Sequence, residues 1–115
     1  LLRQGKKVCT LGPIIHNPQM VDELASKGVR IVESPDQVKT GETLVIRSHG
    51  VPKDVIEDCK KYAKRVEDAT CPFVKKIHRI VEEQSNNGRL IIVIGTESHP
   101  EVQGIIGWCN GPVIV

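Results

Sequence analysis

The chain has 115 residues, of which 39% are hydrophobic and 26% charged, and its formal net charge is +2 at pH 7. That length suits one globular domain or parts of two small ones. Acidic and basic residues are interspersed and there is one Phe, one Tyr and one Trp, so the basic surface and aromatic platforms of nucleic-acid-binding proteins are missing. The longest apolar run, residues 90–94, is far shorter than a membrane span, and the first residues lack a signal-peptide layout. We therefore expect a cytoplasmic protein that binds neither nucleic acid nor a membrane.

Short apolar segments alternate with helical patterns along the chain. Strands are expected at residues 7–11, 29–32, 43–47, 65–69 and 90–94, with the last as the clearest buried strand, and another begins at residue 113. Helices are expected from Pro18 to Lys27, capped by Asn17 and ended by Gly28, and also starting at Pro52, Pro72 and Pro100. This alternation implies right-handed crossovers and an α/β fold, with a mostly parallel sheet flanked by helices.

The apolar faces of the two middle helices can also be predicted. The helix that starts at Pro52 carries Val55, Ile56, Cys59 and Ala63 on one face, and the helix that starts at Pro72 carries Phe73, Ile77, Ile80 and Val81. His78 lies in the second of these helices beside charged neighbours, and we interpret it as a surface residue or a satisfied core residue. Residues 1–5 resemble the last turn of a helix, and residues 113–115 stop inside a strand, so we expect the chain to be a piece of a longer protein.

The four cysteines, Cys9, Cys59, Cys71 and Cys109, are irregularly spaced and form no CxxC motif. A disulfide framework or a zinc ribbon therefore has no local support, and any metal site has to be assembled across the fold. Cys9 lies in a predicted strand, Cys59 on an apolar helix face and Cys109 in a turn. We expect these three to be structural thiols.

A histidine or a cysteine follows four of the predicted strands. These residues are His16, His49, Cys71 and His99, and each is followed within three residues by a proline suited to a first helical turn. In open α/β sheets, ligands bind beyond the carboxyl ends of the strands, where helix N-termini favour anions. Three imidazoles at such positions suit a group with several anionic oxygens, such as a diphosphate.

Each of these residues also has a plainer interpretation. A single histidine at a strand end is more often a capping or loop residue than a ligand. Cys71 is either a small buried residue or, because a helix N-terminus stabilises a thiolate, a ligand of a metal or iron-sulfur cluster or a nucleophile. Glu101 either stabilises the first turn of its helix or delivers protons. Zinc is a weaker alternative to phosphate, because no pair of histidines has the spacing common in local zinc sites.

Four motifs occur in the order and at the approximate spacing known from one enzyme family. They are Ile15-His16-Asn17, Ser48-His49-Gly50-Val51, Asp68-Ala69-Thr70-Cys71-Pro72 and His99-Pro100-Glu101-Val102-Gln103-Gly104. With them the chain resembles the LytB/IspH family of 4-hydroxy-3-methylbut-2-enyl diphosphate reductases. The resemblance implies a three-domain α/β architecture, with residues 1–70 as most of the first domain and residues 71–115 as the start of the second.

The resemblance also implies a cofactor, a reaction and residue roles. Cys71 would be one of three cysteine ligands of a [4Fe-4S] cluster, with the other two outside this chain. His16, His49 and His99 would contact the diphosphate, and Glu101 would belong to the proton-delivery network. The reaction would remove the allylic hydroxyl group with two electrons and two protons, giving isopentenyl and dimethylallyl diphosphate, with ferredoxin or flavodoxin as electron donor.

Three further expectations follow. The isolated chain would neither build the cluster nor catalyse the reaction. Its incomplete second domain would leave apolar surface exposed, which would either pack onto the first sheet or pair with another copy of the chain, so self-association by dimerisation or strand exchange is a hypothesis. Two other functions remain open from the residues alone: a non-catalytic phosphate-binding α/β module, and a zinc-dependent hydrolase that uses the three histidines and Glu101.

Overall fold

The computed structural model describes residues 1–115 and divides them into two compact units. Unit 1 comprises residues 1–48 and 55–69, and unit 2 comprises residues 49–54 and 70–115. The chain therefore leaves unit 1 after Ser48, returns at Val55 and leaves it again after Ala69. None of the helices is both long enough and apolar enough to cross a membrane.

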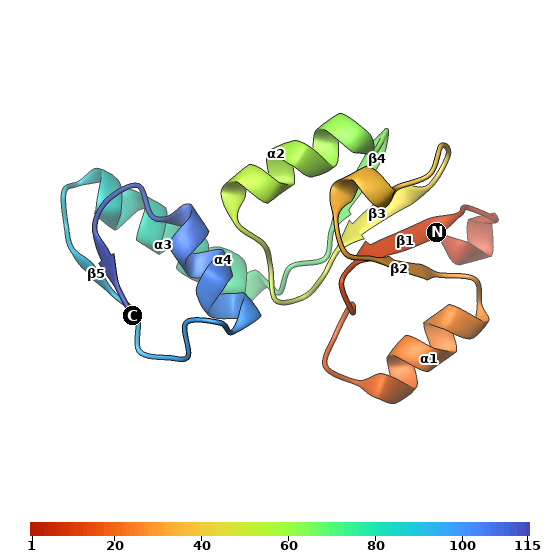
Figure 1. The fold of residues 1–115 in the computed structure, drawn as a ribbon, viewed down its shortest axis with the longest axis horizontal. Coiled ribbons are helices and arrows are strands. Elements are labelled where there is room, and N and C mark those ends of the chain that lie inside the picture. Colours follow the sequence, from red (N-terminus) through yellow and green to blue (C-terminus); the bar gives the residue numbers. More distant parts are fainter. The chain divides into compact units, whose positions relative to one another are not determined.

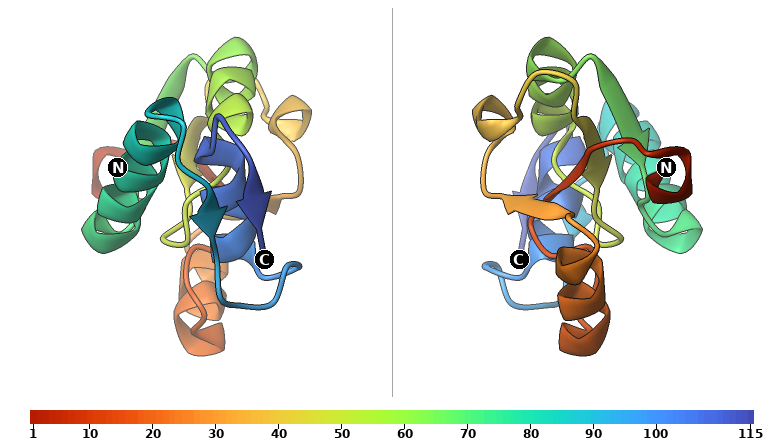
Figure 2. Two further views of the ribbon diagram at one scale, coloured as in Figure 1. Left: turned by 90° about the vertical axis from the view of Figure 1, so that its left-hand side faces the viewer. Right: turned by 90° about the vertical axis from the view of Figure 1, so that its right-hand side faces the viewer.

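Unit 1 is built on a four-stranded parallel sheet with the order β2-β1-β3-β4. Its strands are β1 (Val8–Leu11), β2 (Arg30–Val32), β3 (Thr43–Ile46) and β4 (Arg65–Asp68). Each lies within one residue of its predicted bounds, and the parallel pairing confirms the predicted α/β class. Helices α1 (Pro18–Ser26) and α2 (Lys53–Tyr62) lie on opposite sides of this sheet (Figures 1 and 2).

The ends of α1 follow the capping pattern expected from the sequence. The Asn17 side chain accepts a hydrogen bond from the main-chain N–H of Met20, and Pro18 occupies the first turn. Gly28, with φ +85°, supplies the left-handed turn after the helix. Short 3₁₀ turns at η1 (Leu2–Gln4) and η2 (Pro35–Gln37) complete the unit.

The core of unit 1 is aliphatic and contains two thiols. Its largest fully buried side chains are Leu44, Ile46, Val32, Cys9 and Cys59. Burial raises the pKa of the Cys9 thiol to about 11. Burial raises the pKa of the Cys59 thiol as well. The full burial of both thiols in the core confirms the predicted structural role of Cys9 and Cys59.

Unit 1 also contains an ion pair between the buried Glu42 carboxylate and the partly exposed Arg30. The Glu42 carboxylate accepts hydrogen bonds from Nε and Nη2 of Arg30, both at 2.8 Å, and from the main-chain N–H of Lys39 at 2.8 Å. These bonds lower the pKa of Glu42 to about 2, although its burial acts in the opposite direction. Glu42 is therefore a charged and fully hydrogen-bonded residue of the interior.

Unit 2 contains one long helix, one shorter helix and a small parallel sheet. Helices α3 (Pro72–Asn86) and α4 (Pro100–Trp108) pack against each other, and α3 also contacts β5 (Ile91–Ile92). β5 pairs in parallel with β6 (Val113–Ile114), and α4 forms the crossover between them. The teal and blue parts of the ribbon in Figure 1 show helices α3 and α4.

One prediction about burial in unit 2 is wrong. The segment 90–94 forms a strand only at Ile91–Ile92 and is not buried: Ile92 is 67% exposed and Ile94 is 99% exposed. The apolar stripe of α3 is exposed at Phe73, Ile77 and Ile80, in line with the apolar surface expected to be uncovered here, while the helix buries His78, Val81 and Ser85. A two-stranded sheet with one pair of helices offers too few partners to cover every apolar side chain, so only the face of α3 toward α4 finds a core.

Candidate functional site

The loops that follow β1 and β3 are joined at the carboxyl edge of the sheet in unit 1. The main-chain N–H of Ser48 donates a hydrogen bond to the carbonyl of Ile14, 3.0 Å away. The strand order reverses direction between β1 and β3, which is the point where open α/β sheets bind ligands. Gly12, at φ +69°, begins the first loop, and a Cβ there would lie 2.7 Å from Nη1 of Arg47. Only glycine fits this turn without displacing the arginine.

His16 occupies the first of these loops. It is exposed and directly precedes Asn17, the N-cap of α1. It lines a surface depression together with Pro13, Ile15, Asn17, Pro18, Val21 and Asp22. The predicted site residue is therefore accessible to a ligand beside the N-terminus of a helix.

His49 lies in unit 2 and is buried, with 6% of its surface exposed. The next residue, Gly50, has φ +72°, and a Cβ there would lie 2.7 Å from Cε1 of His78 and 3.1 Å from Cγ2 of Thr70. The chain can follow this path only with glycine after His49. Gly50 thus allows the His49 segment to pack against α3 and Thr70.

Cys71 is the N-cap residue of α3 and is half-buried. Its main-chain carbonyl accepts a hydrogen bond from Lys75 at 3.0 Å, whereas its side chain makes no capping bond and forms no disulfide. Helix N-termini stabilise anionic thiolates. Cys71 lies at a helix N-terminus with its thiol partly accessible to solvent.

His99 and Glu101 share the first turn of α4. His99 is the N-cap, and its Nδ1 accepts a hydrogen bond from the main-chain N–H of Glu101 at 3.2 Å. With Nδ1 acting as an acceptor, the neutral imidazole carries its proton on Nε2. Gln103 fixes the turn further, because its side chain donates to the carbonyl of Glu97 at 2.6 Å and its main-chain N–H donates to the carbonyl of His99 at 3.0 Å.

The predicted site residues fall into two groups. Unit 2 contains His49, Cys71, His99 and Glu101, and unit 1 contains His16. The structure holds no group of three or more His, Cys, Asp or Glu side chains that could bind a metal ion. Cys71 therefore belongs to no such group within this chain.

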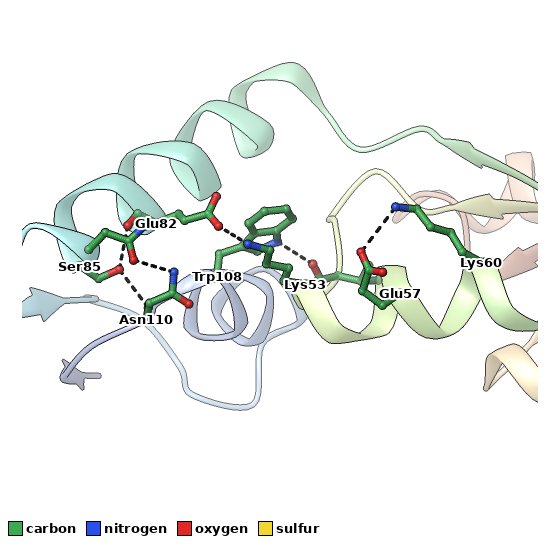
Figure 3. Close-up of polar contacts among 9 residues, drawn as sticks. Lys53, Glu57, Lys60, Glu82, Ser85, Trp108 and Asn110 are labelled. Carbon is green, nitrogen blue, oxygen red and sulfur yellow. Dashed lines mark hydrogen bonds and ion pairs between the residues drawn. The ribbon is translucent and has the colours of Figure 1, made fainter.

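Sequence reasoning missed the residues that hold the His49 segment in unit 2. The indole Nε1–H of Trp108 donates a hydrogen bond to the carbonyl of Val51 at 3.0 Å (Figure 3). On the same helix, a Cβ at Gly107 would lie 2.4 Å from Cβ of Pro52. Helix α4 can approach the segment this closely only because it carries glycine there. The one available signal was a glycine inside a helical pattern, which usually has a packing reason.

All of residues 1–115 match the protein family described as LytB protein. The chain is 47% identical over 113 residues to the 4-hydroxy-3-methylbut-2-enyl diphosphate reductase of Thermoanaerobacter sp. (strain X514), covering 96% of this chain and 39% of that protein. It is 48% identical over 108 residues to the reductase of the same name from Alkaliphilus oremlandii (strain OhILAs), covering 94% of this chain and 38% of that protein. The chain thus spans about 39% of the length of the curated relatives that it matches.

Two solved structures of diphosphate reductases also match the chain. One is a structure of (E)-4-hydroxy-3-methyl-but-2-enyl diphosphate reductase, described as the terminal enzyme of the non-mevalonate pathway. It matches with a TM-score of 0.80 and 43% identity, over 94% of this chain and 39% of that one. The E-1-hydroxy-2-methyl-but-2-enyl-4-diphosphate reductase of Plasmodium falciparum matches with a TM-score of 0.87 and 28% identity, over 98% of this chain and 36% of that one.

Proposed function

Because the chain belongs to the LytB protein family, we propose that it is a segment of a 4-hydroxy-3-methylbut-2-enyl diphosphate reductase of the non-mevalonate isoprenoid pathway. The observation that carries the proposal is the match to that family and its reductases along the whole chain. The full-length protein would remove the allylic hydroxyl group of the substrate, giving isopentenyl and dimethylallyl diphosphate. Residues 1–70 would belong to its first domain and residues 71–115 to its second.

The three histidines would bind the diphosphate. His99 suits this role because it is the N-cap of α4, where its imidazole lies beside a helix N-terminus that favours an anion. His16 is exposed beside the N-terminus of α1, where the helix dipole also favours an anion. His49 would contribute from a buried segment whose path is fixed by Gly50.

Glu101 would supply a proton to the leaving hydroxyl group. Its main-chain N–H is bonded to the His99 imidazole, so the carboxyl group and a diphosphate-binding side chain belong to the same helical turn. Fixing an acid relative to the group that binds the substrate is what general acid catalysis requires. The same turn would therefore serve both binding and proton transfer.

Cys71 would be one ligand of a [4Fe-4S] cluster. Its thiol fits this role because it is half-exposed, free of a disulfide and at the N-terminus of α3. The other two cysteine ligands would come from parts of the protein outside this chain. When bound, the cluster supplies the electrons and the Lewis acidity for removing the hydroxyl group. Ferredoxin or flavodoxin would deliver the electrons, and the enzyme would act in the cytoplasm.

Anaerobic reconstitution of the full-length protein with iron and sulfide tests the cofactor and its ligand. Iron analysis and electron paramagnetic resonance should detect a [4Fe-4S] cluster in the wild type, and Cys71→Ser should lose it. Cys109→Ser is the matched control, because Cys109 is also half-buried and lies in unit 2 but its thiol donates to the carbonyl of Gly111 at 3.3 Å. A cluster that survives Cys71→Ser would contradict the ligand assignment. A protein that binds diphosphate but never iron would instead be a phosphate-binding module.

A further inference from the structure

Helix α4 connects two of the motifs assigned to the diphosphate. Its first turn carries His99 and Glu101, and its last residue, Trp108, reaches back to the segment that contains His49. The indole Nε1–H donates to the carbonyl of Val51 at 3.0 Å, and Val51 is 4% exposed. The hydrogen bond therefore ties a buried carbonyl, two residues after His49, to the helix that bears the other motif.

The Trp108 ring is itself held in place by contacts to α3 and to the same segment. It stacks on His78 of α3, with ring centroids 5.4 Å apart and an interplanar angle of 17°. Nζ of Lys53 lies 5.5 Å from the centroid of the indole and forms an ion pair with Glu82 of α3 (Figure 3). Stacking and cation–π contacts orient an aromatic ring more strictly than apolar packing alone. The direction of the indole N–H is therefore set by its neighbours.

Two glycines let α4 lie directly against the His49 segment. A Cβ at Gly104 would lie 3.1 Å from Nε2 of His78 and 3.8 Å from the carbonyl oxygen of His49. A Cβ at Gly107 would lie 2.7 Å from Cα of Pro52, which is a backbone atom that cannot move independently. The backbone of residues 49–52 thus lies close to α4 at both glycines. Trp108 adds a hydrogen bond to the same segment, through the carbonyl of Val51.

We propose that Trp108 is a positioning residue for diphosphate binding: its hydrogen bond to Val51 fixes the His49 segment on α4 and so holds His49 in a set relation to His99 and Glu101. This inference rests on the proposed function, because it requires that His49 bind the diphosphate. A tryptophan that served only to fill the core would need neither the donated hydrogen bond nor the Lys53 contact. Losing the donor leaves the buried Val51 carbonyl without this partner and frees the segment to shift.

Binding of inorganic diphosphate to the full-length protein, measured by calorimetry, tests the inference in a double-mutant cycle. Trp108→Phe keeps an aromatic ring and removes the N–H, so it should weaken binding about tenfold in the wild-type background. In a protein that already carries His49→Ala, the same change should have little further effect, because there is no imidazole left to position. In turnover, Trp108→Phe should raise KM for the diphosphate substrate more than it lowers kcat.

Ser85→Ala is the matched control for a general loss of packing. It removes the hydrogen bond from the main-chain N–H of Asn110 to Oγ of Ser85, 3.0 Å long, which also joins α3 to the region after α4 (Figure 3). It should leave diphosphate affinity unchanged. If thermal melting shows that Trp108→Phe does not fold, benzothienylalanine at position 108 keeps the bicyclic shape and replaces only the N–H by sulfur.

The outcomes separate the inference from the function on which it rests. Weakened binding with His49→Ala, combined with an equal Trp108→Phe effect in both backgrounds, would overturn the positioning role alone. The positioning role would also be overturned if Ser85→Ala weakened diphosphate binding as much as Trp108→Phe. Unchanged binding with His49→Ala would overturn both the positioning role and the assignment of His49 to the diphosphate.

Discussion

The imidazole of His99 caps α4 by accepting, at Nδ1, the main-chain N–H of Glu101 at 3.2 Å. This residue therefore has a structural role that can be separated from ligand binding. Asparagine is a strong N-cap, whereas alanine is a poor one. His99→Ala should lower the free energy of unfolding by about 1 kcal/mol, while His99→Asn should keep it within about 0.5 kcal/mol of the wild type.

Diphosphate affinity should not follow that pattern. Both His99 variants lose the imidazole, so both should bind inorganic diphosphate more weakly in the full-length protein. Calorimetric titration together with thermal melting measures the two properties side by side. An Asn variant that keeps full affinity would show that His99 acts only as a cap.

Gly107→Ala should destabilise the protein even though alanine favours helices. The added Cβ would lie 2.4 Å from Cβ of Pro52 and 2.7 Å from its Cα, so overpacking should cost about 2 kcal/mol. Gly111→Ala is the control, because its nearest neighbour would lie at an ordinary 3.4 Å. Chemical denaturation should place Gly111→Ala within about 0.5 kcal/mol of the wild type. Equal stability of the two variants would contradict the close approach of α4 to Pro52.

The buried Glu42 predicts how stability depends on pH. Its folded pKa is about 2, below the value of 4.5 for an unperturbed carboxyl group, so it binds a proton more readily in the unfolded state. Its contribution is present above pH 4.5 and is lost as the pH falls toward about 2. Glu42→Gln should cost about 2 kcal/mol at neutral pH through the weakened bonds to Arg30. The difference between variant and wild type should shrink in this acidic range, and a constant difference would contradict the role of the ion pair.

The isolated 115-residue chain should self-associate. Phe73 is 79% exposed and Ile94 is 99% exposed, and association would remove such apolar area from water. Light scattering over a range of concentrations should show species larger than a monomer. Phe73→Lys should shift the distribution toward the monomer, with Lys76→Arg as a control on an exposed position of the same helix. A strictly monomeric wild-type chain at high concentration would contradict the expectation.

The sequence was sufficient for the parts of the fold that depend on local chemistry. Asn17-Pro18 and Gly28 predicted both ends of α1, because capping and left-handed turns are decided by the residues that occupy them. The parallel sheet of unit 1 followed from the alternation of short apolar runs with helices. For the same reason, the strand ends that carry His16 and Cys71 could be predicted.

Burial in unit 2 and the support of the site could not be predicted in this way, because both depend on tertiary partners. Leu90 to Ile94 is the most apolar run in the chain, yet periodicity does not say whether a covering layer is present. His78 lies among charged neighbours in the sequence but is buried against Trp108. The bond from Trp108 to Val51 joins residues 57 positions apart, beyond the reach of any local pattern.

Conversion of 4-hydroxy-3-methylbut-2-enyl diphosphate by the full-length protein is the most direct test of the proposed function. The reconstituted protein would be assayed without oxygen, with a low-potential chemical reductant, and the products separated by chromatography. We predict formation of isopentenyl and dimethylallyl diphosphate by the wild type and its loss in Glu101→Gln, a change that keeps the shape of the side chain but removes its proton. Binding of the diphosphate without any conversion by the cluster-loaded wild type would contradict the assignment as a reductase.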